Sequence, residues 1–109
     1  MNAGVIDMTP EHRRLVVGIL RVHLPAGAAV WVFGSRATGR ARRYSDLDLA
    51  VDAGRPLSLD ETGALAEAFS DSDLPYRVDI VDWQMISEAF RRLIAADRLP
   101  LLAMATKSC

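Results

Sequence analysis

Residues 33 to 51 read FGSRATGRARRYSDLDLAV, and this stretch carries most of the information about fold and chemistry. It begins at the end of a short apolar run, Ala29 to Phe33, which is rich in strand-forming residues and stops at Gly34-Ser35. After ten intervening residues, the segment Asp46 to Asp52 (DLDLAVD) alternates between polar or small residues and large apolar ones. Both segments are therefore predicted to be β-strands, joined by one turn of helix and a loop over Arg36 to Tyr44.

The alternation places two carboxylates on one face of the second strand. Side chains two residues apart in a strand point the same way, so Asp46 and Asp48 project together and the apolar residues between and after them face a core. Asp79 lies in a further predicted strand, Tyr76 to Trp83 (YRVDIVDW). If the two strands are neighbours, about 5 Å apart, the carboxylate of Asp79 can join the pair.

Three carboxylates in one place repel one another. Each pair at about 4 Å costs roughly 1 kcal/mol in water and several times more in a partly buried site. Proton uptake or a bound cation must offset this repulsion. Oxygen ligands without a histidine or thiol favour a hard ion, so Asp46, Asp48 and Asp79 are candidate ligands of Mg²⁺, with Mn²⁺ as the alternative.

Gly34 and Ser35 are candidates for binding a phosphate group. A glycine at a strand end lets the backbone approach a phosphate closely, and Ser35 with the amides that follow it can donate hydrogen bonds. Arg36, next to Ser35, is expected to balance the charge of a triphosphate. The other arginines of this loop, at positions 40, 42 and 43, are expected to be solvated.

The combination of these features is more specific than any one of them. An Asp-x-Asp pair occurs easily by chance, and Asp71-x-Asp73 is a second one in this chain. Gly-Ser directly after an apolar run, at a fixed distance from an Asp-x-Asp that opens a strand, is far rarer. For the third acid, Asp82 competes with Asp79; period two puts these two residues on opposite faces of their strand, so only one of them can join the pair.

The remaining segments complete a small α/β domain. Thr9-Pro10-Glu11 starts a helix that ends before Pro25, Ser58 caps a helix to about Ser70, and Ser87 to Asp97 is predicted to be the last helix. We expect a single domain, 1–109, with a mixed sheet of three to four strands and helices mainly on one face. The apolar residues of the last segment, Leu93, Ile94 and Leu99 to Ala105 with its Pro100, belong either to the core or to a partner or dimer surface.

Composition excludes several classes of protein. The formal net charge of −1 does not favour stable nucleic-acid binding, which usually accompanies a basic domain. The single cysteine, Cys109, allows no internal disulfide, and no apolar run approaches the roughly 20 residues that span a bilayer. His12 and His23 are expected to be structural or surface residues. A cytoplasmic location without a membrane segment or signal peptide is expected.

The motif Gly34-Ser35, ten residues, Asp46-Leu47-Asp48 resembles that of the DNA polymerase β-type nucleotidyltransferase superfamily, and in particular its minimal single-domain branch, the MNT proteins. The resemblance extends from Thr9 to about Asp97. It implies a nucleotidyltransferase fold in which Asp46 and Asp48 bind metal. It also implies that Asp79 completes the site and assists as a base, and that Gly34 and Ser35 hold the nucleotide phosphates.

The resemblance also implies a partner. Many MNT proteins act as antitoxins of HEPN-domain ribonucleases, which implies transfer of AMP from ATP to a tyrosine hydroxyl of such a toxin. Two alternatives stay open: an antitoxin that neutralises its partner by contact alone, and a nucleotidyltransferase acting on a small molecule or RNA. The intact motif favours turnover, and the lack of an added substrate domain in the sequence argues against the last alternative. The acceptor and the oligomeric state, homo- or hetero-oligomeric, are not given by the sequence.

Overall fold

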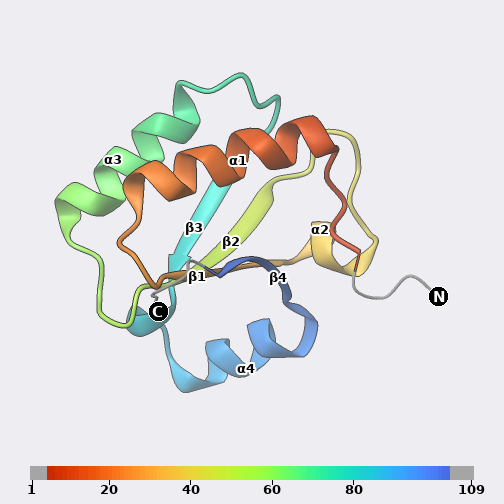
Figure 1. Cartoon of the computed structure of the whole chain (residues 1–109). Helices are drawn as coiled ribbons and strands as arrows, with labels where there is room; N and C mark the ends of the chain where they lie inside the picture. The colour runs from red at the N-terminus through yellow and green to blue at the C-terminus, as the bar shows by residue number, and fades with distance from the viewer. Residues whose placement is uncertain (1–4, 104–109) are drawn as a thin grey trace.

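The computed structural model describes residues 5–103, which form one four-stranded mixed sheet flanked by helices (Figure 1). The strand order is β3-β2-β1-β4; β1 is antiparallel to both β2 and β4, and β2 is parallel to β3. The strands are β1 (Ala29–Phe33), β2 (Leu47–Asp52), β3 (Val78–Asp82) and β4 (Leu99–Ala103). The helices are α1 (Pro10–His23), α2 (Ser35–Thr38), α3 (Leu59–Ser70) and α4 (Glu88–Asp97), with a 3₁₀ turn, η1 (Trp83–Met85), after β3.

The start signals read from the sequence are present as hydrogen bonds. The Thr9 hydroxyl accepts from the His12 amide at 3.1 Å, and Pro10 occupies the first turn of α1. At α3, Ser58 and Glu61 form a complete capping box. The predicted helices and the first three strands are thus confirmed to within about two residues at each end.

The main core lies between the sheet and the helices α1 and α3, which cover one face (Figure 1). The apolar residues that alternate with Asp46 and Asp48 are fully buried there, as predicted. They pack with the inward faces of α1 and α3, of which Leu20 and Leu65 are also fully buried. Helix α4 lies on the opposite side of the sheet, so the prediction of helices mainly on one face holds with α4 as the exception.

Aromatic side chains occupy the sheet face on the side of α4. Trp31 of β1 packs against Trp83 of η1 with ring centroids 5.5 Å apart, and the Arg98 guanidinium lies 4.1 Å from the centroid of the Trp31 ring. Phe33 meets Phe90 of α4 edge to face at 6.3 Å. Trp31 and Phe33 therefore form a second, thinner layer of packing beneath β1 and do not belong to the main core.

The apolar residues of α4 and β4 lie partly in the core and partly on the surface. Ile94, Leu101 and Leu102 are buried, whereas Leu93 is 70% exposed. Strand β4 was not assigned from the sequence, because Pro100 interrupts the apolar run; an edge strand tolerates proline, since one side needs no partner. Residues 104 and 105 of the predicted apolar segment, and Cys109, lie outside the described residues.

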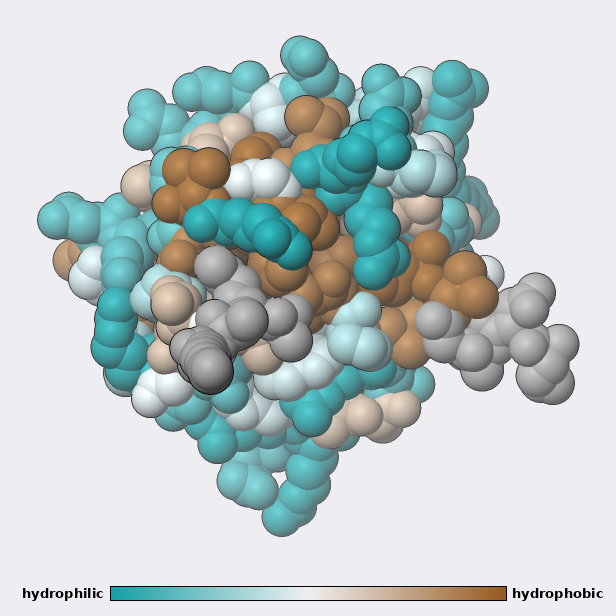
Figure 2. All heavy atoms as spheres, in the orientation of Figure 1, coloured by the Kyte–Doolittle hydropathy of each residue, from teal (hydrophilic) through white to brown (hydrophobic). Residues whose placement is uncertain are grey.

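The space-filling view of the same side shows apolar surface gathered across its middle, bordered by polar side chains (Figure 2).

Within residues 5–103, no helix is long and apolar enough to cross a membrane.

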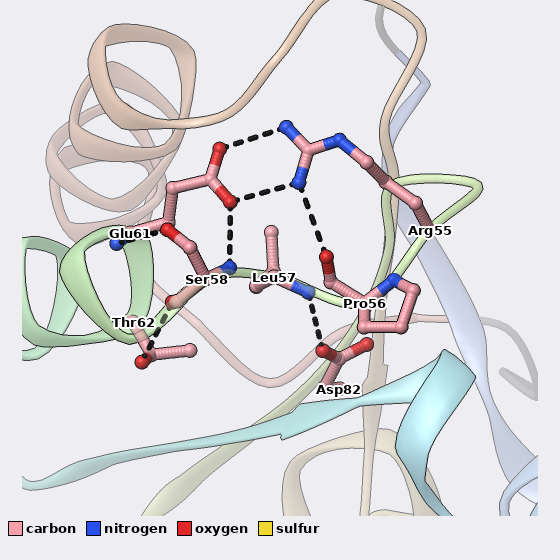
Figure 3. Close-up of polar contacts among 7 residues, drawn as sticks. All are labelled: Arg55, Pro56, Leu57, Ser58, Glu61, Thr62 and Asp82. Carbon is pink, nitrogen blue, oxygen red and sulfur yellow. Dashed lines mark hydrogen bonds and ion pairs between the residues drawn. The ribbon is translucent and has the colours of Figure 1, made fainter.

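Asp82 is part of a set of polar contacts at the end of β3, close to the start of α3 (Figure 3). Its carboxylate accepts from the Leu57 amide at 2.8 Å and from the Gln84 amide at 3.0 Å. Beside it, Arg55 forms a two-point ion pair with Glu61 at 2.9 Å, which lowers the pKa of Glu61 to about 2. Asp82 therefore fixes the loop that leads from β2 to α3.

Replacing Asp82 with alanine is expected to lower the free energy of unfolding by about 1 to 3 kcal/mol, because two amides lose their acceptor. Urea denaturation measures this. Asp73→Ala, in an exposed loop, should stay within about 0.5 kcal/mol of wild type. Equal effects of the two substitutions would contradict the structural role of Asp82.

Candidate active site

The parallel pairing of β2 with β3 brings two acids side by side. Asp48 and Asp79 are direct partners in the register, and Leu47 pairs with Val78 one position earlier. Since the side chains of Leu47 and Leu49 enter the main core, the Asp48 side chain points to the other face, together with Asp79. Phe33 is the register partner of Asp48 on the opposite neighbour, β1.

The third acid lies at the entrance of the same strand. Asp46 directly precedes β2, two residues before Asp48, and is exposed, whereas Asp48 is half-buried. The pKa of the Asp48 carboxyl is raised, first by burial and then by the charges of Asp79 and Asp46. Asp48 thus experiences the repulsion that the sequence analysis anticipated for a group of three carboxylates.

The glycine of the Gly-Ser pair lies against the same carboxylate. Gly34 joins β1 to α2 with a positive φ of 74°, which only glycine adopts easily. A Cβ atom added to Gly34 would collide with the carboxylate of Asp48. The Gly-Ser motif and the Asp-x-Asp motif, separated in sequence, are therefore neighbours in space, and Ser35 follows directly as the first residue of α2.

Arg36 has a different position from the one that nucleotide binding would require. Its side chain is only 4% exposed, and each of its three guanidinium nitrogens donates to a backbone carbonyl. Nη1 binds the Asp7 carbonyl at 2.8 Å, while Nε and Nη2 bind the Ser45 carbonyl at 3.0 and 2.9 Å. The guanidinium also stacks on the Tyr76 ring at 3.9 Å. Arg36 therefore holds the loop that carries Asp46 in place. The other arginines of this loop are exposed, as expected.

His12 also contacts Tyr76. It is a structural residue, as expected. Its Nδ1 lies 3.2 Å from the Tyr76 hydroxyl, and the two rings meet edge to face. Tyr76 is thereby held between α1 and Arg36, ahead of β3.

Arg77 is a residue of the site that the sequence reasoning missed. Its Nη2 lies 3.0 Å from Oδ1 of Asp79, and the charges of Asp79 and Asp46 both raise its pKa, after the hydrogen bond with Asp79. The available signal was its spacing: Arg77 and Asp79 are two residues apart in a strand, as Asp46 and Asp48 are.

The donor set suits a hard cation, but the side chains are not gathered around one. Asp46, Asp48 and Asp79 offer only carboxylate oxygens, the ligands that Mg²⁺ and Mn²⁺ prefer. Within the described part of the chain, no group of three or more acidic, histidine or cysteine side chains stands ready to hold a metal ion. The carboxylate of Asp79 is engaged by Arg77 instead.

The site is an open surface. A hollow of about 870 Å³ lies between the segment Val5 to Thr9, the end of α2 and the junction of α4 and β4. None of the three acids lines it. The carboxylates stand near the sheet margin, since β3 is an edge strand, so a large acceptor can approach them without any part of the fold opening.

Comparison with known proteins identifies the family. Residues 20–103 match the family described as polymerase β, nucleotidyltransferase. The chain belongs to this nucleotidyltransferase family. The matched segment contains the Gly-Ser pair and all three carboxylates described above, together with the four-stranded sheet.

The individual relatives are a probable protein adenylyltransferase and proteins solved in toxin–antitoxin structures. The chain is 47% identical over 89 residues to a probable protein adenylyltransferase MntA of Haemophilus influenzae, covering 82% of this chain and 77% of the relative. A solved toxin–antitoxin structure with AMP-PNP superposes with a TM-score of 0.73 and 27% identity, over 84% of this chain and 73% of the other. An MNT antitoxin in complex with a tri-AMPylated HEPN toxin of Shewanella oneidensis has the same fold (TM-score 0.68, 24% identity, 89% and 74% covered).

Gly34→Ala is expected to destabilise the chain more than Gly39→Ala. Both glycines have a positive φ, 74° and 77°, but an added Cβ meets nothing within 4 Å at Gly39 and collides with Asp48 at Gly34. Backbone strain alone costs roughly 1 to 2 kcal/mol, so Gly39→Ala should lose about that much and Gly34→Ala clearly more. Urea denaturation of the two variants measures the difference; equal losses would show that the contact with Asp48 does not matter.

Arg36→Lys is expected to lower the free energy of unfolding by about 1 to 3 kcal/mol, because an ammonium group cannot reproduce the fork of donors to separate carbonyls. Thermal denaturation without nucleotide tests this. A variant with wild-type stability and only a raised KM for the nucleotide would instead support direct nucleotide binding by Arg36.

Proposed function

We propose that this nucleotidyltransferase transfers AMP from ATP to a hydroxyl group of a partner protein, a tyrosine of a HEPN-domain ribonuclease toxin, and so acts as an antitoxin. The observation that carries the proposal is the placement of Asp48 beside Asp79 in the sheet, with Gly34 against Asp48. The relative named as a probable protein adenylyltransferase and the toxin–antitoxin structure with AMP-PNP support the choice of AMP and of a toxin as acceptor.

The residues take separate tasks in this reaction. Gly34 and Ser35 bind the phosphates of ATP, and Asp46, Asp48 and Asp79 hold Mg²⁺, with Mn²⁺ as a substitute. When held by these carboxylates, the metal ion would supply positive charge to the phosphates. The hydroxyl oxygen of the acceptor attacks the α-phosphorus, the bond from that phosphorus to the β-phosphate oxygen breaks, and pyrophosphate leaves.

Asp79 is the candidate for accepting the hydroxyl proton. It belongs to the edge strand, its side chain is 42% exposed, and it faces the same side as Asp48. An acceptor that arrives from the sheet margin reaches Asp79 first. The more buried Asp48 has a raised pKa, which a cation would reverse by favouring the charged carboxylate.

The open surface around the carboxylates suits a protein acceptor. The side chains of Phe90 and Leu93 on α4 are 37% and 70% exposed, on the side of the sheet that carries the acids. An enzyme for a small molecule usually encloses its substrate in a cleft of several hundred Å³. None of the three acids lines the hollow of about 870 Å³ described above.

Asp48→Asn is expected to reduce AMP transfer at least about a hundredfold while the fold is kept, because a ligand of the metal and its charge are lost. The measurement is intact mass spectrometry of proteins captured on the chain from its native lysate, before and after Mg²⁺-ATP is added. AMP-sized mass steps should occur on a captured partner with wild type and be absent with Asp48→Asn.

Asp73→Asn, in the other Asp-x-Asp pair of the chain, is the matched control and should transfer at the wild-type rate. Transfer by Asp48→Asn at the wild-type rate would refute the assignment of the site. A captured partner that never gains mass, with a neutralising effect that survives Asp48→Asn, would favour an antitoxin that works by contact alone.

A further inference from the structure

Arg77 lies beside the three carboxylates, next to Asp79 and level with Asp46. Asp48 pairs with Asp79 in the parallel register, and one position before the first pair of that ladder, Asp46 stands at the level of Arg77. The Leu47 amide donates to the Arg77 carbonyl at 2.9 Å, as this register requires. Asp46 and Asp48, just before and within β2, therefore face one side of the sheet. Arg77 and Asp79, just before and within β3, face the same side.

In this arrangement the positive charge beside Asp79 is the Arg77 guanidinium and not a metal ion. Its Nη2 lies 3.0 Å from Oδ1 of Asp79, and the two side chains are 78% and 42% exposed. A metal ion and a guanidinium cannot contact the same carboxylate oxygens without strong mutual repulsion. Arg77 contacts Oδ1 of Asp79, so a metal ion that binds Asp79 through Oδ1 must displace Arg77. An exposed ion pair of this kind is weak, so displacement is easy.

We propose that Arg77 is a positioning residue that exchanges partners when the site is loaded. In the metal-free chain it holds Asp79; when a divalent cation takes Asp79, the Arg77 guanidinium turns to the phosphate oxygens of the nucleotide. This inference rests on the proposed function of the site. It assigns to Arg77 the contact with triphosphate that Arg36, with its guanidinium directed at backbone carbonyls, does not provide in this structure.

The chemistry of the group fits both states. A guanidinium offers a planar set of donors that matches carboxylate and phosphate oxygens equally well. The long, exposed stem of Arg77 starts two residues from Asp79 on the same face of the edge strand, so the released group stays within the site. Because the same side chain competes with metal and attracts nucleotide, its removal has opposite effects on the two ligands.

The test uses the whole chain and two titrations by calorimetry. Mn²⁺ alone is titrated into wild type and Arg77→Gln, followed by α,β-methylene ATP, which cannot transfer AMP, in the presence of saturating Mn²⁺. Arg77→Gln is expected to bind Mn²⁺ about two- to fivefold more tightly, since a weak surface pair no longer competes. It should bind the nucleotide about tenfold more weakly, because a charged hydrogen bond is lost.

Two further variants sharpen the result. Arg77→Lys keeps the charge without the fork, so its Mn²⁺ affinity should stay near wild type and its nucleotide affinity should recover in part. Arg55→Gln breaks the other ion pair of the described residues, with Glu61, and should change neither affinity.

The outcomes separate this inference from the proposed function. If wild type binds Mn²⁺ and Arg77→Gln leaves both affinities unchanged, or weakens both, the exchange is refuted while the metal site stands. If wild type binds neither Mn²⁺ alone nor the nucleotide in the presence of Mn²⁺, the proposed function itself is refuted. Tighter Mn²⁺ binding together with weaker nucleotide binding supports the exchange, because a purely structural role would not move the two affinities in opposite directions.

Discussion

The parallel pairing of β2 with β3 is the constraint on which the rest of the site depends. Strand β2 is hydrogen-bonded on both sides and buries Leu47, Leu49 and Val51 completely against α1 and α3. A slip of one residue would turn these three side chains out and push carboxylates into the core, so the register is strongly fixed. The carboxylates of Asp48 and Asp79 are therefore held side by side by the packing of the opposite face, although they repel each other.

Much of this arrangement could be predicted from the sequence, because the signals were local. The alternation of DLDLAVD gave the faces of β2, and the Ser58 cap gave the start of α3 within one residue. Period two put Asp79 and Asp82 on opposite faces, and the family resemblance favoured Asp79. In the structure Asp79 pairs with Asp48, whereas Asp82 accepts hydrogen bonds from two backbone amides. The sequence could not say which strand lies beside β2. The structure shows that it is β3.

The features that the sequence did not predict depend on contacts between distant residues. Arg36 follows Ser35 directly, which suggested a phosphate ligand, but its donors reach carbonyls 9 and 29 residues away. Strand β4 becomes a strand only because β1 offers it an edge, despite Pro100. Arg77 was not singled out from the sequence, since the pairing of β3 with β2 is what places it beside Asp46. In each case the local pattern was compatible with several structures, and long-range packing selected one.

The tryptophan pair has a practical consequence for studying this chain in solution. Trp31 and Trp83 are its only two tryptophans, they lie 5.5 Å apart, and Trp31 is on the same strand face as Phe33, which neighbours Asp48. Intrinsic tryptophan fluorescence therefore originates in one place, on the sheet face that carries the acids. Coupling between two indoles this close also gives a circular dichroism signal that depends on their mutual angle. The chain thus contains an unlabelled optical reporter for events on that face of the sheet.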